Sequence, residues 1–252
     1  IDWSDITNRP SGLDDGDDVG LTSVSWDDIQ DTAKIIFNGT DFIFRSLNVH
    51  VQSGSGSTDG AINGLGNLIV GYNEERDTDS NKSGSHNLVV GANHNYTLYG
   101  GTVGGFGNTI SGLYSTVSGG QGNIASSNSS SVSGGYQNTA SGSVSSVSGG
   151  FGNTASGSWS SVSGGFGNTA AGESSSVSGG RNNTASEDGF NTWIGGGQFN
   201  QASGGDFYFA GGSVSGGEHN TASGYWSSVS GGYQRSATGM DDWAAGSLWE
   251  ND

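Results

Sequence analysis

Few residues of this chain have the types and spacing that catalysis or metal binding requires. The four histidines, His50, His86, His94 and His219, are scattered without a metal-binding spacing, and the sequence contains no cysteine. No serine lies in the strand-to-helix context of a hydrolase nucleophile. Paired carboxylates that could cleave a glycosidic bond would have to come from the acidic N-terminal segment. We therefore expect a protein that is not an enzyme.

One group of potential metal ligands lies near the N-terminus. Four aspartates flank a single glycine, at Asp14, Asp15, Asp17 and Asp18. Carboxylate oxygens on a flexible turn suit calcium, although this spacing matches no complete calcium-binding loop. Calcium is accordingly the one cofactor hypothesis that the sequence supports, and the alternative is a solvated acidic linker.

Aromatic residues gather in the C-terminal third of the chain, where two insertions lengthen the regular spacing described below. The candidate ligand-binding residues there are Phe190, Trp193, Phe207, Tyr208 and Trp226. Exposed rings of this kind can form a platform for a sugar or protein ligand. The alternative is that the rings fill the interface between chains of an oligomer.

The aromatic candidates lie in a region of internal sequence repeats, and the fold of these repeats determines where their side chains point. The second glycine of a Gly-Gly pair recurs every fifteen residues from Gly105 to Gly180, and looser copies extend from Gly71 to Gly232. Alternation at period two around each glycine predicts two short strands per repeat, joined by glycine turns. Fifteen residues at ~3.3 Å each close a loop of about 50 Å at most, which suffices for two faces. We predict an all-β fold, a parallel β-solenoid (β-roll) of about eleven coils with about fifteen residues per coil.

Each position of the repeat uses few residue types. The aliphatic position, three residues before the glycine, includes Leu68, Leu88 and Thr102 in the early copies and valine in most later ones. Coils stacked in register would place each residue on its own copies, so that an asparagine column runs along the axis. This structural column consists of Asn108, Asn123, Asn138, Asn153, Asn168, Asn183, Asn200 and Asn220. Its amides can bond one another along the axis, or each asparagine can instead cap a turn in the left-handed conformation.

In one such coil, Val132 and Gly134 are expected to face Asn138 and Ala140 across the interior. An interior of glycine, alanine and valine buries little apolar area, whereas ordering glycine is costly in backbone entropy. Association of several chains would compensate by covering a further face of each coil. We therefore expect an obligate homo-oligomer.

The unit SSVSGGYQNTASG resembles the head repeat of trimeric autotransporter adhesins, the YadA-like or haemagglutinin-type repeat with the pattern S-V-A-I-G-x-x-A-x-A-x-G. Val132 falls on the valine of this pattern, Gly135 on its glycine and Ala140 on its second alanine, while Gly134 replaces the isoleucine. The resemblance covers about Leu65 to Gly239. It implies a left-handed β-roll, three chains associated into a trimeric rod, and a surface-exposed head that binds host matrix proteins or other cells.

From this resemblance we expect an extracellular, cell-surface scaffold that acts as a bacterial adhesin. The alternatives are a subunit of an extracellular filament or sheath that stacks end to end, and a polysaccharide-binding module. Ice binding, which requires a regular flat array of threonines, is disfavoured because the outward serines are mixed with aromatic residues in the sequence.

The charge of the chain and its apolar runs exclude some partners and indicate its domain boundaries. With a net charge of -17 and only seven basic residues, binding to nucleic acid or anionic lipid is disfavoured, and no apolar run is long enough to insert into a membrane. We divide the chain into an acidic linker (1–33), an N-terminal cap (34–64), the β-roll (65–239) and a C-terminal cap or stalk junction (240–252). Within the N-terminal cap, two apolar runs around Asn38-Gly39 predict a β-hairpin.

Overall fold

The computed structural model describes residues 35–37, 40–45, 47–188, 190–204 and 211–246, and all regular elements in these ranges are strands. No helix in the described ranges could cross a membrane. The chain divides into two units, residues 1–50 and 51–252. Residues 1–33, including the aspartates of the calcium hypothesis, lie outside the described residues.

The first unit contains a two-stranded antiparallel sheet of β1 (Ile35–Phe37) and β2 (Phe42–Phe44). Ile35 pairs with Phe44, and Phe37 pairs with Phe42. The two apolar runs therefore form the predicted hairpin, whose turn residues Asn38 and Gly39 lie outside the described part of the chain.

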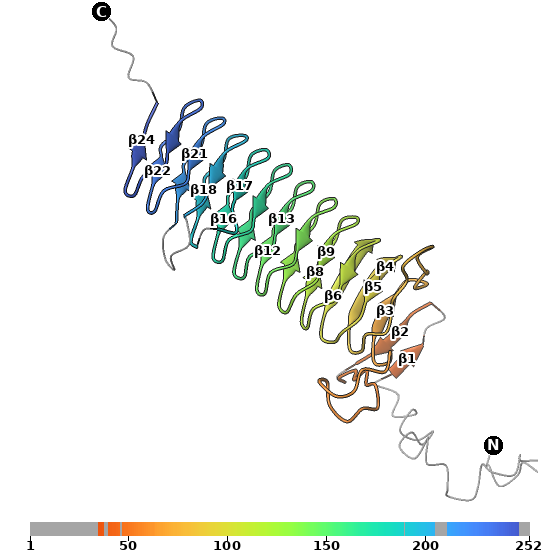
Figure 1. The fold of residues 1–252 in the computed structure, drawn as a ribbon. Helices are drawn as coiled ribbons and strands as arrows, with labels where there is room; N and C mark the ends of the chain where they lie inside the picture. The colour runs from red at the N-terminus through yellow and green to blue at the C-terminus, as the bar shows by residue number, and fades with distance from the viewer. Residues whose placement is uncertain (1–34, 38–39, 46, 189, 205–210, 247–252) are drawn as a thin grey trace, which may run out of the picture. The chain divides into compact units, whose positions relative to one another are not determined.

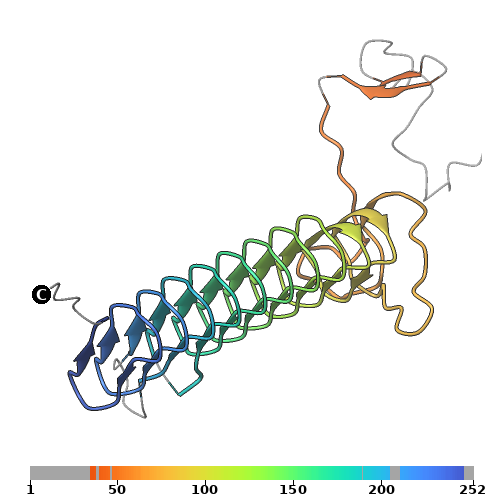
Figure 2. The same cartoon turned by 90° about the horizontal axis from the view of Figure 1, so that it is seen from above.

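The second unit is a parallel β-solenoid, in which successive coils are stacked along one axis (Figures 1 and 2). One sheet has twelve strands: β3 (Leu68–Val70), β4 (Leu88–Ala92), β6 (Thr102–Phe106), β8 (Thr116–Val117), β10 (Ser131–Val132), β12 (Ser146–Val147), β14 (Ser161–Val162), β16 (Ser176–Val177), β18 (Trp193–Ile194), β20 (Ser213–Val214), β22 (Ser228–Val229) and β24 (Trp243–Ala244). The other has ten: β5 (Asn95–Tyr96), β7 (Thr109–Ile110), β9 (Ile124–Ala125), β11 (Thr139–Ala140), β13 (Thr154–Ala155), β15 (Thr169–Ala170), β17 (Thr184–Ala185), β19 (Gln201–Ala202), β21 (Thr221–Ala222) and β23 (Ser236–Ala237).

The stacking follows the fifteen-residue period of the sequence. Val132 pairs in parallel with Val117 on one side and Val147 on the other, so each residue lies on its own copy. This register confirms the predicted parallel β-solenoid. Ten coils contribute a strand to both sheets, one fewer than predicted, because the copy that ends at Gly71 contributes only β3 to the twelve-stranded sheet.

The interior is a narrow layer between the two sheets. Val132, Asn138 and Ala140 are fully buried, as the alternation predicted. The prediction for Gly134 was wrong: a Cβ built on it would meet no atom within 4 Å, so this glycine does not face packed neighbours. Ser130 is buried in its coil instead. In the six coils that contain β8, β10, β12, β14, β16 and β18, two polar and two apolar side chains are therefore buried.

The aliphatic position of the first coils was also assigned one residue too early. Val89 and Val103 are the fully buried residues, and Val103 pairs with Val117. Leu88 is exposed and Thr102 is half-buried. The physical reason is a shorter strand-to-turn segment, since Val103 stands two residues before its glycine and Val117 three.

Candidate functional site

The asparagine column exists, and its hydrogen bonds run mainly to the backbone. Asn153 Nδ2 donates to the carbonyl of Gly149 in its own coil at 2.9 Å and to that of Gly165 in the next coil at 3.0 Å. Its Oδ1 accepts a bond from the backbone N–H of Asn168 at 2.9 Å. The same pattern recurs along the column. Each side chain therefore connects two coils. Direct bonding between amides, one of the two hypotheses from the sequence, occurs where Asn183 Nδ2 donates to Asn168 Oδ1 at 3.1 Å.

Left-handed residues stand beside this column, at both turns of the coil. Gln137, directly before Asn138, has a φ of 55°, and Val144 at the opposite turn has a φ of 58°. The column asparagines themselves do not have positive φ. The second hypothesis, a column asparagine in the left-handed conformation at a turn, was therefore wrong. The residue directly before the asparagine has this conformation instead. The two turns form the narrow edges of the solenoid, and the side chains of their left-handed residues lie on the surface.

His94 occupies the asparagine position of the first full coil. It is 1% exposed, its Nδ1 accepts a bond from the backbone N–H of Asn108 at 3.2 Å, and its Nε2 lies 3.1 Å from the carbonyl of Val90. Burial lowers the pKa of His94 below its ordinary value. The ring therefore favours the neutral form and takes the place of an asparagine in the column.

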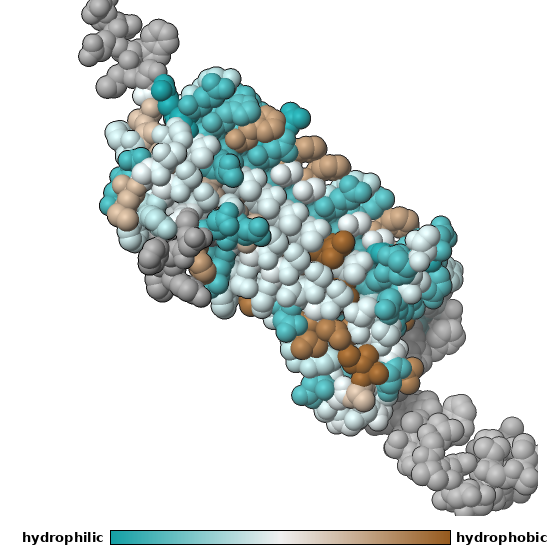
Figure 3. All heavy atoms as spheres, viewed as in Figure 1, coloured by the Kyte–Doolittle hydropathy of each residue, from teal (hydrophilic) through white to brown (hydrophobic). Residues whose placement is uncertain are grey.

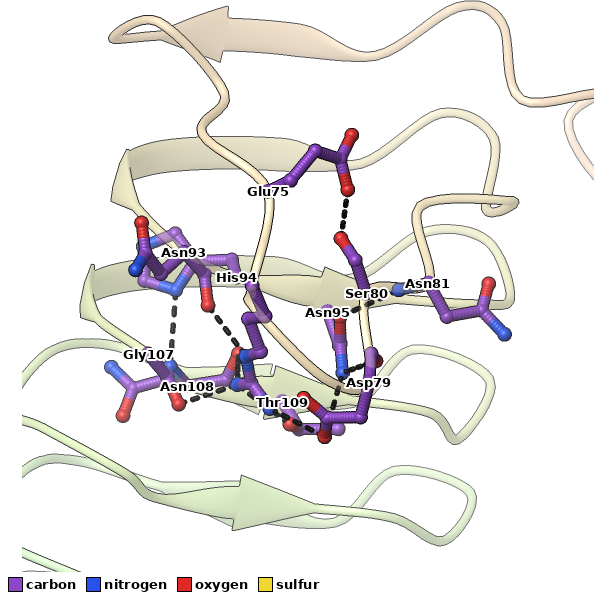
Figure 4. A network of polar contacts seen from close by, with 11 residues as sticks. Glu75, Asp79, Ser80, Asn81, Asn93, His94, Asn95, Gly107, Asn108 and Thr109 are labelled. Carbon is purple, nitrogen blue, oxygen red and sulfur yellow. Dashed lines mark hydrogen bonds and ion pairs between the residues drawn. The ribbon is translucent and has the colours of Figure 1, made fainter.

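The polar segment between β3 and β4 folds back on the first coils (Figure 4). Arg76 donates to the carbonyls of Asn93 at 2.7 Å and Asn108 at 2.9 Å, and to Thr109 Oγ1 at 3.0 Å. The same guanidinium forms an ion pair with Asp79 at 3.2 Å. A hydrogen bond from Ser80 lowers the pKa of Glu75 in this segment. All these polar groups bind one another or the backbone, so the network anchors a loop.

The most distinctive surface feature is a row of stacked rings on the turn after the repeat glycine. We define the aromatic row as Tyr136, Phe151 and Phe166, whose ring centroids lie 5.3 and 5.0 Å apart. Arg181 continues the row, with its guanidinium carbon 5.4 Å from the centre of the Phe166 ring. The three rings are 39% to 45% exposed. This exposed apolar row lies on a rigid edge and is a candidate contact surface.

The geometry of the row limits what it can bind. The planes of Phe151 and Phe166 differ by 4°, and those of Tyr136 and Phe151 by 19°. Each inner ring face is therefore covered by its neighbour, and the row presents ring edges outward. A sugar stacks on a free ring face, whereas an apolar protein surface can pack against edges. The row fits a protein contact better than a glycan.

The three described candidates, Phe190, Trp193 and Trp226, lie at different positions of their coils. Trp193 lies on the outward face of β18, while Trp226 lies on a turn with a φ of 54°. Phe190 is half-buried beside the insertion, and Phe207 and Tyr208 lie outside the described residues. The aromatic row was not among the candidate residues chosen from the sequence. Its fifteen-residue spacing was the signal that the rings would stack.

In the described ranges, the side chains that could bind a metal ion are scattered. Across them, no three histidine, aspartate or glutamate side chains come close enough together to hold a metal ion. His219, the other histidine near the asparagine position, stacks on Phe199 with centroids 4.9 Å apart and is part of an exposed ring cluster.

Comparison with known proteins yields no family for this chain. No protein-family model matches the sequence, and no curated protein matches it significantly.

Proposed function

We propose that this protein is a non-catalytic, rod-like attachment scaffold, an adhesin-like protein of the bacterial cell surface. The observation that carries the proposal is the exposed aromatic row, Tyr136, Phe151 and Phe166, held on one edge of an in-register solenoid. Rigid stacking keeps the rings at fixed positions, so little side-chain entropy is lost when a partner covers them. The resemblance to adhesin head repeats supports the same function.

We further propose that the rod works as a homotrimer outside the cell. The supporting observation is the thin interior, in which one valine and one alanine per coil, such as Val147 and Ala155, supply the buried apolar side chains. Light scattering coupled to size-exclusion chromatography tests this directly. A mass of three chains is expected, and a stable monomer at micromolar concentration would remove the energetic argument for association.

Attachment is tested with immobilised collagen and fibronectin as matrix proteins and with a glycan array. The variant Phe151→Ser/Phe166→Ser removes two rings of the row, and Val144→Ser on the opposite edge is the matched control. We expect retention on matrix protein that the double variant loses and the control keeps. Equal binding by both variants would exclude the row, and binding only to glycans would favour the polysaccharide-binding alternative.

A filament subunit is the second candidate, because Trp243 on the last strand of the twelve-stranded sheet is 68% exposed. End-to-end stacking would cover this ring and pair the strand edge. Sedimentation over a range of protein concentrations distinguishes the two functions. Polymers that grow with concentration and disappear in Trp243→Ser would support the filament.

A further inference from the structure

A second surface, separate from the aromatic row, is the outward face of the ten-stranded sheet. Its strands β11, β13, β15 and β17 follow the pattern Asn-Thr-Ala-Ser, with alanine in place of the serine after β15. Asparagine and the strand alanine point inward, and the residues between and after them point outward. We define the hydroxyl face as two columns of residues. The threonine column is Thr139, Thr154, Thr169 and Thr184, and beside it run Ser141, Ser156, Ala171 and Ser186.

The columns are in register from coil to coil. Thr154 pairs with Thr139 on one side and with Thr169 on the other. In the second column, the Ser141 N–H donates to the Ala155 carbonyl and the Ser156 N–H to the Ala170 carbonyl, both at 2.9 Å. Coils of a parallel ladder are ~4.8 Å apart, and alternate residues of a strand are ~6.6 Å apart. The outward groups therefore form a two-dimensional lattice.

This lattice carries no charged side chains. From Gly100 to Ser186 the sequence contains two charged residues, Glu173 and Arg181, and both lie on turns. The aromatic residues of these coils also lie on the turns, at positions such as Phe151 and Trp159. Serines and aromatic residues are therefore mixed along the sequence, but the hydroxyl face of these coils contains no aromatic residue. Figure 3 shows intermediate hydropathy over the middle of the visible side of the solenoid, with hydrophilic areas toward both ends and separate hydrophobic patches.

The residue types of the hydroxyl face limit the class of partner that it can bind. A soluble protein surface recognises a few large anchoring side chains, which this face lacks in these coils. A polysaccharide would need ring faces to stack on, and none is present among the threonines and serines. An uncharged surface that repeats in two dimensions can instead sum many weak contacts with a partner that repeats at similar spacings. Threonine adds a methyl group beside each hydroxyl, and its β-branch restricts its rotamers.

We propose that the hydroxyl face binds ice. Hexagonal ice presents planes of hydrogen-bonding oxygens that are uncharged and repeat in two dimensions at spacings comparable to those of the two columns. The threonine hydroxyls bond to the outermost oxygens, and the methyl groups fill the spaces between them. This activity goes beyond attachment through the aromatic row and uses a different surface, so either can fail without the other.

The test is inclusion of the full chain in ice grown slowly from a dilute solution, compared with serum albumin as a non-binding protein. Thr154→Lys/Thr184→Lys places two charges on the hydroxyl face, two coils apart. Ser146→Lys/Ser176→Lys places two charges on the twelve-stranded sheet with the same separation and is the matched control. Far-ultraviolet circular dichroism and light scattering show that each variant keeps the fold and association of the parent.

We expect the parent and the control to be enriched in ice and the threonine variant to fall to the level of albumin. Inclusion of the parent no higher than albumin would overturn the proposal. Equal loss in both variants would overturn it as well, because the effect would then not belong to the hydroxyl face. Retention on microcrystalline cellulose without inclusion in ice would replace ice by a polysaccharide.

Discussion

The backbone N–H of Asn168 donates a hydrogen bond to Oδ1 of Asn153, 2.9 Å away in the preceding coil. Asn153 also donates through Nδ2 to the backbone carbonyls of Gly149 and Gly165. Removing a buried side chain that makes several hydrogen bonds is costly to stability, because each of its former partners is left buried without a hydrogen bond. The column therefore contributes strongly to the stability of a solenoid whose apolar interior is small.

Replacing Asn153 by alanine should lower the free energy of unfolding by about 3 kcal/mol, since three bonds are lost and buried backbone groups are left unpaired. Urea denaturation of the parent and variant measures the difference. Ser148→Ala, at an exposed position of the same coil, is the control and should change stability by less than ~0.5 kcal/mol. A small loss for Asn153→Ala would mean that water replaces the amide.

Two adjacent glycines should respond differently to alanine. Gly150 has a φ of 89°, and a Cβ on it would lie 2.2 Å from the carbonyl oxygen of Gly165. Gly150→Ala should therefore cost about 3 kcal/mol or prevent folding. A Cβ on Gly149 meets nothing within 4 Å, so Gly149→Ala should be neutral or slightly stabilising. Thermal melting of both variants provides the comparison, and similar melting temperatures would contradict the close approach of the coils.

Replacing a buried serine that lacks a hydrogen-bond partner should increase stability. Within the described residues, Oγ of Ser160 is buried and has no hydrogen-bond partner, as is also the case for Ser145 and Ser175. Ser160→Ala should stabilise the protein by about 1 kcal/mol, because an unpaired polar group no longer has to be buried. Ser130 Oγ donates to the Ser127 carbonyl at 2.7 Å, so Ser130→Ala should be destabilising instead. Opposite signs in urea denaturation are the expected result.

Stability should depend on pH through His94. Its pKa is lowered in the fold, chiefly by burial, so the unfolded chain binds a proton more readily. The contribution of His94 is therefore complete above its unfolded pKa of about 6.5 and decreases as the pH falls through that value toward the lower folded pKa. Melting temperatures between pH 7.5 and 5 measure this loss. In His94→Asn, which restores the usual column residue, the dependence over this range should be weaker, and an unchanged profile would assign it to other groups.

The period and the residue types of the sequence were sufficient to predict the fold class and the buried columns. Val132, Asn138 and Ala140 lie where alternation placed them. Alternation did not predict the environment of Gly134, because a strand pattern was extended into residues that already form the turn. The early coils were misaligned since glycine was used as the fixed point, whereas the buried valine sets the register.

The surfaces were harder to predict than the interior. Stacking of Tyr136, Phe151 and Phe166 follows from equal spacing in the sequence, but the covering of their ring faces depends on side-chain orientation. Separation of Trp159 from the threonine columns likewise required the turn geometry, in which this residue has a φ of 56°. Residues that alternate in the sequence can thus belong to different surfaces in the solenoid.

Each inner coil pairs only with the coil before it and the coil after it, as Val147 does with Val132 and Val162. Cooperativity in such a molecule is one-dimensional, so thermal unfolding begins at the termini and advances coil by coil. A severe defect at mid-length would divide the protein into two independently melting halves. Duplication of a fifteen-residue unit, by contrast, would lengthen the molecule without creating a new kind of contact.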